Sequence, residues 1–205
     1  MANSNTDKDY YFTIEKESVA EFKDRGSRFL AYAFPVSSAD SFKKRLRELK
    51  VEHPKAVHHC FAYRIGTDGN NFRSSDDGEP SGSAGRPILG QIDSKELTNT
   101  AIVIVRYFGG TLLGVPGLIN AYKTSASFAL QLTPVVKKSI LLSYQLQFDY
   151  TLMNEVMTII KKYQCEIYFQ QTQLFCLLHI GIPKGRLEEV LDKFKNLSKV
   201  AVEKR

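Results

Sequence analysis

The chain has 205 residues, of which 43% are hydrophobic and 24% are charged, and its formal net charge at pH 7 is +6. A chain of this size buries one or two ordinary hydrophobic cores, and its modest positive charge permits contact with RNA without requiring it. No apolar stretch approaches the roughly 18 residues that cross a bilayer, and the first ten residues contain no hydrophobic signal-peptide centre. These features exclude an ordinary membrane-spanning or exported protein, and we expect the chain to act in the cytoplasm.

Residues 1–9 are expected to be disordered, and residues 10–134 are expected to form a first α+β domain. A helix is predicted from Ser38 to Lys50, because apolar residues recur there at helical spacing and Ser37 with Asp40 resembles a helix start. The Asp68-Gly69 pair is a strong hairpin signal. Strands are predicted in this domain at residues 10–16, 28–36, 58–65, 72–75 and 101–108.

The densest run of positive charge lies on the predicted helix and consists of Lys43, Lys44, Arg45 and Arg47. Such a run is either a solvated helix face or a patch for nucleic acid. We favour the solvated face, because strong phosphate-backbone binders concentrate many more Lys and Arg residues on one face.

Eight of the 13 glycines lie between Gly78 and Gly117, in the blocks SSDDGEPSGSAGRPILG and VRYFGGTLLGVPGLINAYK. A folded chain keeps glycine where the backbone takes positive φ or where another group approaches the main chain closely. The first block leads into a helix expected to start near Pro87, and the second leads into a helix ending near Leu130. The clustered glycines indicate either a binding surface, which we favour, or tight turns and close helix packing.

The start of each of these two helices is a candidate anion site. Unpaired backbone N–H groups and the helix dipole favour phosphate or carboxylate at a helix N-terminus. We expect Arg86 and Arg106 to add charge, in an open hollow lined by both guanidinium groups. Alone, such a site reaches at best the edge of micromolar affinity. The blocks match neither the P-loop pattern nor the dinucleotide-binding glycine fingerprint.

The pattern changes at residues 132–138, where Pro134 ends the preceding helix, and we place a linker there. Residues 135–205 are expected to form a second domain with the ferredoxin-like order βαββαβ. The turn between its middle strands is predicted at residues 170–172, although no glycine is present there. Its strands are predicted at residues 140–150, 165–169, 174–180 and 200–202, and its helices at 152–163 and 187–194.

The open face of this second sheet is expected to be polar. The residues predicted to lie on it are Ser143, Gln145, Gln147 and Gln170. Because these side chains are polar rather than aromatic, base stacking of the RNA-recognition-motif kind is not expected.

Three segments resemble motifs of the Impact/YigZ family: HHCFAYRIG at 58–66, DGEPSGSAGRPIL at 77–89 and RYFGGTLLG at 106–114. They recur in the order of the family's motifs, and with the strand before them they span most of residues 10–130. The remaining residues resemble the smaller C-terminal domain of bacterial members.

The resemblance implies a cytoplasmic protein linked to translation. Eukaryotic relatives are regulators that bind a partner of a translation-factor kinase, whereas bacterial relatives have no settled biochemical role. The resemblance also implies an N-terminal fold similar to the second domain of a small-subunit ribosomal protein. For the C-terminal domain it implies a fold similar to the last domain of elongation factor G. The ribosome, RNA or a translation-related protein is therefore the implied partner.

The second glycine loop departs from the family pattern. Leu112 stands where many members have lysine after the glycine pair, and Val115-Pro116 replaces a glycine-containing link. The loop is therefore less basic than in those relatives, and any phosphate contact there depends more on Arg106 and Lys123.

We expect a non-enzymatic protein that binds an acidic or phosphate-bearing partner through its glycine-rich surface, without a cofactor. The residues expected to form this surface are Asp77, Gly78, Glu79, Gly85, Arg86, Pro87, Arg106, Tyr107, Gly109, Gly110, Gly114, Gly117 and Lys123.

The alternative is an enzyme acting on phosphate esters or nucleotides, with Asp77, Glu79 and Arg86 performing metal-assisted chemistry. The same composition also describes an ordinary polar loop, and no histidine lies in a recognisable nucleophile motif. A metal site at His58 and Cys60 is disfavoured, because no second cluster supplies the remaining ligands. All three cysteines are expected to be buried free thiols.

Overall fold

The computed structural model describes residues 8–205, which form two compact units. The first unit runs from Tyr11 to Lys138, and the second runs from Ser139 to Arg205 and includes the short segment that ends at Tyr10. The division after Lys138 lies four residues beyond the boundary predicted from the sequence. Of the predicted disordered segment 1–9, residues 1–7 lie outside the described residues. No helix within residues 8–205 is long and apolar enough to span a membrane.

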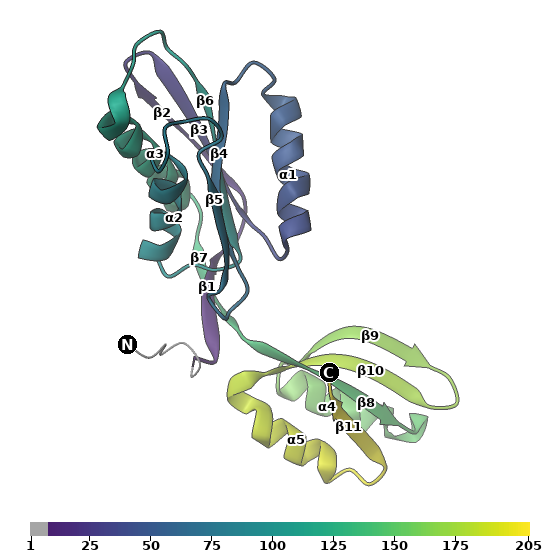
Figure 1. Ribbon diagram of the computed structural model, residues 1–205. Coiled ribbons are helices and arrows are strands. Elements are labelled where there is room, and N and C mark those ends of the chain that lie inside the picture. Colours follow the sequence, from purple (N-terminus) through teal and green to yellow (C-terminus); the bar gives the residue numbers. More distant parts are fainter. Residues whose placement is uncertain (1–7) are drawn as a thin grey trace. The chain divides into compact units, whose positions relative to one another are not determined.

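The first unit is built on an antiparallel five-stranded sheet with the order β2-β3-β6-β4-β5 (Figure 1). Its strands are β2 (Ser18–Asp24), β3 (Ser27–Pro35), β4 (His58–Ile65), β5 (Asn71–Ser75) and β6 (Thr100–Tyr107). β6 is the central strand, and all of its residues except the last are buried. A charged side chain on β6 therefore needs a partner within the protein.

One face of this sheet is covered by α1 (Ala39–Glu52), as Figure 1 shows. Phe42 and Leu49 of α1 are buried and pack in one cluster with apolar side chains of β3, β4 and β6. Burial of two such side chains contributes on the order of 3–6 kcal/mol, so α1 is held mainly by this apolar contact.

Ser38 caps α1. Its Oγ accepts a hydrogen bond from the N–H of Ser41 at 3.1 Å, and Ser41 Oγ accepts from the N–H of Ser38 at 3.2 Å. This reciprocal capping box lies one position after the pair predicted from the sequence, Ser37 and Asp40. Both positions fit the residue preference, and Ser38 has the extended backbone that brings its hydroxyl back to the helix.

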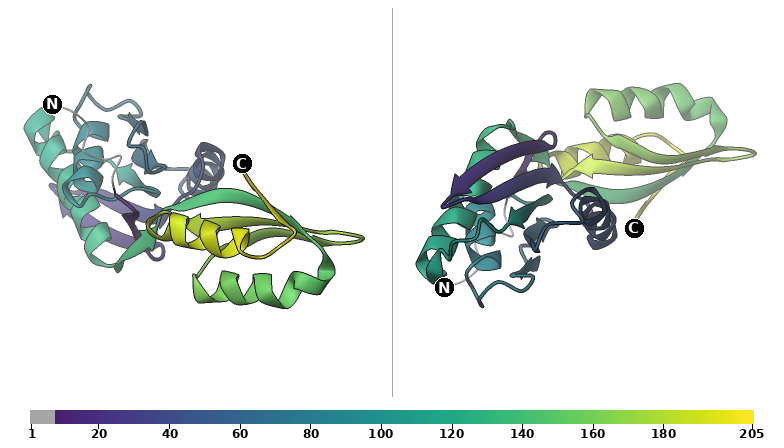
Figure 2. Two further views of the ribbon diagram at one scale, coloured as in Figure 1. Left: turned by 90° about the horizontal axis from the view of Figure 1, so that it is seen from below. Right: turned by 90° about the horizontal axis from the view of Figure 1, so that it is seen from above.

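The opposite face of the sheet is covered by α2 (Gly85–Ser94) and α3 (Gly114–Gln131), which lie on the other side of the strands from α1 in both views of Figure 2. Here Phe29, Ile104 and Tyr122 belong to the largest hydrophobic cluster of the unit. The two glycine-rich blocks thus end in helices that pack on the same sheet face.

The sequence prediction missed two strands, β7 and β2. β7 (Val135–Ser139) occupies the predicted linker and pairs with β1 (Tyr10–Ile14) in a separate two-stranded sheet. β2 was also missed, although its burial alternates as in a half-exposed strand. Its apolar positions Val19 and Phe22 do not share one face, so the alternation is weak in the sequence.

The second unit has the predicted order βαββαβ, and its antiparallel sheet has the order β11-β8-β10-β9. Helices α4 and α5 share one core with this sheet, with Val156, Ile160, Val190 and Phe194 buried. The elements are β8 (Leu141–Phe148), η1 (Tyr150–Leu152), α4 (Met153–Lys162), β9 (Glu166–Thr172), β10 (Cys176–Pro183), η2 (Lys184–Arg186), α5 (Leu187–Lys195) and β11 (Val200–Lys204).

The hairpin of the second unit differs from the prediction. β9 continues to Thr172, so the turn comes after the predicted residues 170–172. Gln170 pairs with Leu178, which belongs to the helix-covered core, whereas Phe169 stands opposite His179 with ring centroids 4.9 Å apart. Because paired residues share a sheet face, Phe169 lies on the open face and Gln170 does not. The predicted placement of Gln170 on the open face is therefore wrong, and that face includes the aromatic ring of Phe169.

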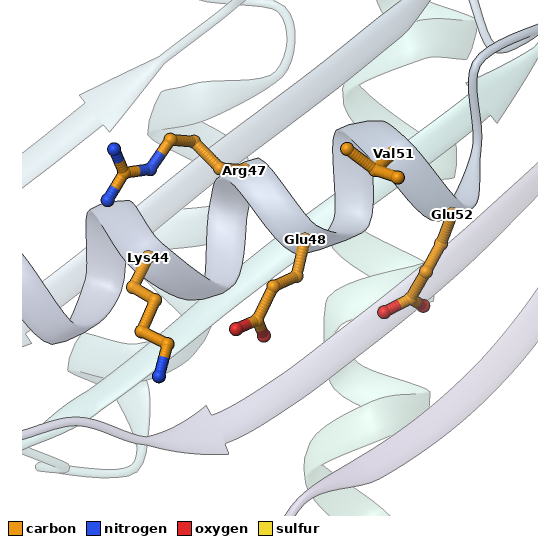
Figure 3. A pocket seen from close by; sticks show the side chains of 5 residues that line it. All are labelled: Lys44, Arg47, Glu48, Val51 and Glu52. Carbon is orange, nitrogen blue, oxygen red and sulfur yellow. The ribbon is translucent and has the colours of Figure 1, made fainter.

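The outer face of α1 carries charges of both signs, as Figure 3 shows for Lys44, Arg47, Glu48 and Glu52. Arg45 forms ion pairs of 2.8 Å and 3.4 Å with Glu52 and Glu48 of the same helix, and another of 2.8 Å with Glu17. Acidic partners therefore offset much of the positive run. The arrangement is that of a solvated helix face rather than a phosphate-binding stripe.

Candidate functional site

The N-terminus of α2 holds a carboxylate from the chain itself. Asp76 Oδ1 accepts hydrogen bonds from the N–H groups of Ala84 at 3.0 Å and Gly85 at 2.8 Å, and its Oδ2 accepts from the N–H of Gly82 at 2.9 Å. Burial opposes ionisation of this carboxyl group, but the three N–H donors outweigh burial and lower the pKa of Asp76. The anion site predicted at this helix start is therefore already filled, and α2 begins at Gly85 rather than near Pro87.

Two glycines of the first block are required by the close approach of other groups. A Cβ at Gly85 would lie 2.7 Å from the backbone nitrogen of Ser75. Gly78 has a φ of +91°, and a Cβ there would lie 3.3 Å from Nδ1 of His58. Arg86, the second residue of α2, is exposed and has no hydrogen-bond or ion-pair partner within residues 8–205. Gly78 and Gly85 in this block therefore allow neighbouring segments of the chain to pack closely.

Asp77 anchors the first loop to β4. Its Oδ2 accepts a hydrogen bond from the N–H of His59 at 2.7 Å, and its carbonyl oxygen accepts from Nδ1 of His58 at 2.8 Å. Lys50 Nζ lies 3.7 Å from the other carboxylate oxygen. These contacts hold Asp77 in a left-handed backbone conformation with a φ of +42°. Its role is structural in this geometry.

Arg106 on β6 and Glu79 in the first loop form a buried ion pair. Nη1 of Arg106 lies 2.5 Å from Oε1 of Glu79, and the two side chains are 6% and 3% exposed. Nη2 reaches Ser27 Oγ at 3.5 Å, and Nε is buried without a partner. The predicted open hollow lined by Arg86 and Arg106 is therefore wrong. A charge on a central, buried strand is stable only when it is paired inside the protein.

The second glycine loop packs against the turn between β2 and β3. A Cβ at Gly109 would lie 1.9 Å from the backbone carbon of Gly26, and the N–H of Gly109 donates to Ser27 Oγ at 3.2 Å. Gly110 and Gly114 have φ values of +86° and +69°. Glycine adopts these values without strain, so the loop reaches the start of α3 along a path that other residues disfavour.

α3 begins at Gly114 with no side chain capping its N-terminus. Its first N–H groups and the positive end of the helix dipole are therefore not neutralised by a side-chain acceptor. Gly117 follows in the first turn, where a Cβ would lie 3.1 Å from Cβ of Leu113. Close contact between this turn and the preceding loop shapes the surface at the helix start.

Tyr107 and Lys123 lie away from this surface. Tyr107 packs against the hydrophobic cluster on the α1 side of the sheet, and its hydroxyl lies 2.9 Å from Nδ1 of His53. Lys123 is exposed on α3. The structure therefore does not bring these two residues together with Arg106.

A pocket of about 390 Å³ is formed by the start of α3, the first glycine loop and the adjoining ends of β4 and β6. Its polar side chains are those of His58, Glu79 and Arg106. Of the binding residues predicted from the sequence, Glu79, Arg106 and Gly114 line it. The apolar side chains that line it include Val57, Phe108, Leu112, Leu113, Val115 and Leu118.

A buried hydrogen-bond network holds the carboxylate of Glu79. The hydroxyl of Tyr122 on α3 donates to Oε1 of Glu79 at 2.7 Å, and Cys60 Sγ lies 3.3 Å from that hydroxyl. Burial raises the pKa of both Tyr122 and Cys60, so both groups stay protonated at neutral pH. The Glu79 carboxylate is therefore held by one neutral donor, the Tyr122 hydroxyl, and by Arg106.

The residues of the alternative, enzymatic prediction do not converge. Asp77 is bound to the backbone of His59, Glu79 is bound to Arg106, and Arg86 is exposed. Within residues 8–205, no group of three or more His, Cys, Asp or Glu side chains is placed to hold a metal ion. The geometry thus gives no metal-assisted arrangement of these three residues.

Sequence reasoning missed the apolar rim of the pocket. Leu112 is 81% exposed, Phe108 48% and Val115 46%. His58 was considered as a metal ligand and as a catalytic histidine but not as part of a binding pocket, and Tyr122 was not considered. The available signal was the replacement of lysine by Leu112, which we interpreted only as a loss of positive charge.

Comparison with known proteins agrees with the three motifs. The model of the Impact N-terminal domain family matches residues 25–130. A Haemophilus influenzae protein described as an IMPACT family member is 35% identical over 180 residues, which cover 87% of each chain. The chain belongs to the Impact family. The Escherichia coli family member YigZ is 32% identical over 175 residues, covering 84% of this chain and 86% of its own.

The fold of the whole chain also has a solved counterpart. A crystal structure described as that of a hypothetical protein shares 28% identity with this chain, with a TM-score of 0.77. The match covers 97% of this chain and 98% of the other. Both units of this Impact family protein therefore have counterparts in one related structure.

Proposed function

We propose that this chain is a non-enzymatic binding protein of the translation apparatus, and that the pocket at the start of α3 accepts an apolar group of its partner. The observation that carries the proposal is the meeting of all three family motifs at one pocket. His58 comes from the first motif, Glu79 from the second, and Arg106 and Gly114 from the third. Impact family membership supports the link to translation regulation.

The finer parts of the sequence prediction belong to this proposal. In this proposal the chain acts in the cytoplasm, and its partner is the ribosome, RNA or a translation-related protein. Its two units are proposed to resemble a ribosomal-protein domain and an elongation-factor domain. An acidic or phosphate-bearing partner is less well supported at this pocket, because Arg106 is engaged by Glu79.

The exposed rim supports an apolar contact. Large apolar side chains gathered around a concave site are typical of interaction surfaces, and Leu112 is the most exposed of them here. Complete burial of one leucine side chain contributes about 1.5–3 kcal/mol, which corresponds to about 10- to 100-fold in affinity. Loss of the Leu112 side chain is therefore expected to weaken the affinity for the partner measurably and to leave the stability of the free protein nearly unchanged.

Sedimentation of the purified protein with ribosomes over a salt series tests the proposal. Leu112→Ser is expected to weaken co-migration about tenfold or more. The matched control is Leu174→Ser, because Leu174 is 87% exposed but lies in the second unit. The control is expected to co-migrate like the wild type.

Salt dependence separates the proposed apolar contact from a phosphate contact. An apolar contact persists at high salt, whereas binding to phosphates weakens steeply as salt rises. A complex that persists at high salt and is lost in Leu112→Ser supports the proposal. Equal co-migration of Leu112→Ser, Leu174→Ser and the wild type would refute it.

A further inference from the structure

The unpaired polar groups at the start of α3 are hydrogen-bond donors. No side chain caps this helix, and the N–H groups of Leu113, Gly114 and Val115 donate to no acceptor within residues 8–205. The side chain of Arg106 is 6% exposed, and its Nε is buried without a partner. Arg106 and these three residues line the same pocket. A buried donor without a partner is rare in folded proteins, so two independent features of this pocket indicate an acceptor from outside the chain.

The charges that line the pocket nearly balance. The carboxylate of Glu79 is paired with the guanidinium group of Arg106. The start of α3 adds a positive potential equal to about half an elementary charge. An ammonium group is therefore disfavoured. A carboxylate or phosphate would bring at least one full negative charge out of water with only this half charge to offset it, and such a transfer is costly. The charge balance therefore favours a neutral acceptor.

The start of α2 shows which groups take such an acceptor in this protein. Asp76 accepts hydrogen bonds there from the N–H groups of Ala84 and Gly85, which are the N-cap residue and the first residue of the helix. The corresponding N–H groups of α3 lie beside apolar side chains of the pocket, among them Phe108 and Leu118. An acceptor bound at α3 is therefore expected to be attached to an apolar group.

The exposed rim points to a partner protein as the source of this acceptor. Leu112 and Val115 extend the apolar surface outward from the pocket. A peptide segment contacts this rim and the pocket together, whereas a small free molecule fills the pocket alone. Each residue of a peptide also carries a neutral carbonyl oxygen beside its side chain.

We propose that the pocket accepts a neutral carbonyl group flanked by an apolar side chain, namely a backbone carbonyl of the partner protein next to a leucine-like residue. The carbonyl oxygen accepts hydrogen bonds from the N–H groups at the start of α3. The apolar side chain packs against Phe108, Leu112 and Leu118. This inference rests on the proposed function and specifies the chemistry of the partner.

NMR titration of the wild-type protein with four small probes that share one branched apolar group tests the inference. The probes are isocaproyl dimethylamide, its thioamide analogue with a weakly accepting sulfur, isocaproate and isohexylammonium. We expect the dimethylamide to bind at least about fivefold more tightly than each of the others. Shifts are expected at the amides of residues 113–115 and at the Nε–H of Arg106. Equal binding of the thioamide, tighter binding of either charged probe, or no shift at these groups would overturn the inference.

A blocked leucine peptide, N-acetyl-leucine methylamide, distinguishes a partner's backbone from a small-molecule ligand. We expect it to bind at least as tightly as isocaproyl dimethylamide, and weaker binding would overturn the assignment to a backbone carbonyl. In Arg106→Lys, which lacks the Nε–H donor, the preference for the dimethylamide over the thioamide is expected to fall. Because that variant also disturbs the ion pair with Glu79, the comparison of probes on the wild type decides the question by itself.

The two proposals fail in different ways. If Leu112→Ser releases ribosomes but the dimethylamide shows no preference over the thioamide and the charged probes, the binding function stands and the carbonyl inference is wrong. If the dimethylamide is preferred but Leu112→Ser keeps its full affinity for ribosomes, the pocket chemistry stands and the proposed function is wrong.

Discussion

The two helices that follow glycine-rich loops begin in opposite ways. α2 begins over the carboxylate of Asp76, which accepts three backbone N–H groups. α3 begins without a side-chain cap, and its first two residues, Gly114 and Val115, line a pocket. One helix start is closed by a side chain of the protein itself and the other has no side-chain cap, although both follow similar glycine-rich sequences.

An upstream acid accounts for this difference. The loop before α2 contains Asp76, nine residues before Gly85, and the chain folds back so that its carboxylate meets the helix. The loop before α3, residues 108–113, contains no acidic residue. In this protein, the presence or absence of an acid in the preceding loop therefore decides whether a side chain of the protein itself fills the helix start. Variants at each loop test this comparison.

Gly109→Ala is expected to have the largest effect on stability. Its Cβ would lie 1.9 Å from the backbone carbon of Gly26, so the second loop separates from the turn between β2 and β3. We expect a loss of more than about 4 kcal/mol in the free energy of unfolding, measured with urea. Gly110→Ala is the matched control, because its Cβ meets nothing within 4 Å. It costs about 1–2 kcal/mol through backbone strain, and similar losses for both variants would contradict the packing.

Arg106→Ala and Arg86→Ala separate the two arginines that the sequence placed together. Removing Arg106 leaves the buried carboxylate of Glu79 without its ion-pair partner and is expected to cost about 3–4 kcal/mol. Arg86 is exposed and is expected to change stability by less than about 0.5 kcal/mol. Thermal unfolding of both variants checks this order. A small loss for Arg106→Ala would mean that the ion pair does not form.

Asp76→Ala opens the N-terminus of α2 and is expected to cost about 2–3 kcal/mol at neutral pH. The pKa of Asp76 is lowered in the folded state, so its contribution is present at neutral pH and disappears as the pH falls below about 4. Urea unfolding between about pH 6 and pH 3 should therefore show a smaller stability loss for the variant than for the wild type.

The control for Asp76→Ala is Asp93→Ala. Asp93 pairs with Arg64 at 2.8 Å, but its side chain is 43% exposed. Its removal is expected to cost less than about 1 kcal/mol. Parallel pH profiles for the wild type and Asp76→Ala would show that Asp76 does not cap α2.

Tyr122→Phe is expected to have the smallest effect, about 1 kcal/mol. The variant removes the hydroxyl that donates to Glu79 Oε1 at 2.7 Å but leaves Arg106 on the same oxygen. The ring of Tyr122 stays in the core, so its apolar burial is retained. Urea unfolding provides the measurement, and a loss as large as that of Arg106→Ala would contradict this ranking.

Periodicity and turn chemistry predicted most of the helices and strands, because these signals are local. The helical spacing of Phe42 and Leu49 in α1 is an example, whereas the cap of that helix was predicted one position too early. β7 was missed because its five residues include two adjacent lysines and read as a linker. Its pairing with β1 joins segments more than a hundred residues apart, which no local pattern indicates.

The glycine-rich blocks pointed to the loops beside the candidate pocket, but the pairing of the charges there was not predicted. The glycine blocks located the loops correctly, yet the pairing of Glu79 with Arg106 joins residues 27 apart in the sequence. One sequence feature pointed to that pairing: Arg106 ends the apolar run AIVIV of a strand that is buried on both faces. A charge in such a run requires an internal partner, and Glu79 is one of the two acids in the motif at residues 77–89.

Site-specific photocrosslinking tests the central claim, that the open start of α3 is the partner site, most directly. A photoreactive phenylalanine analogue is placed at position 112 on the pocket rim or, as a control, at position 174 in the second unit. We expect a translation component to be crosslinked from position 112, in competition with unmodified protein, and no such product from position 174. Crosslinking from position 174 with none from position 112 would contradict the claim.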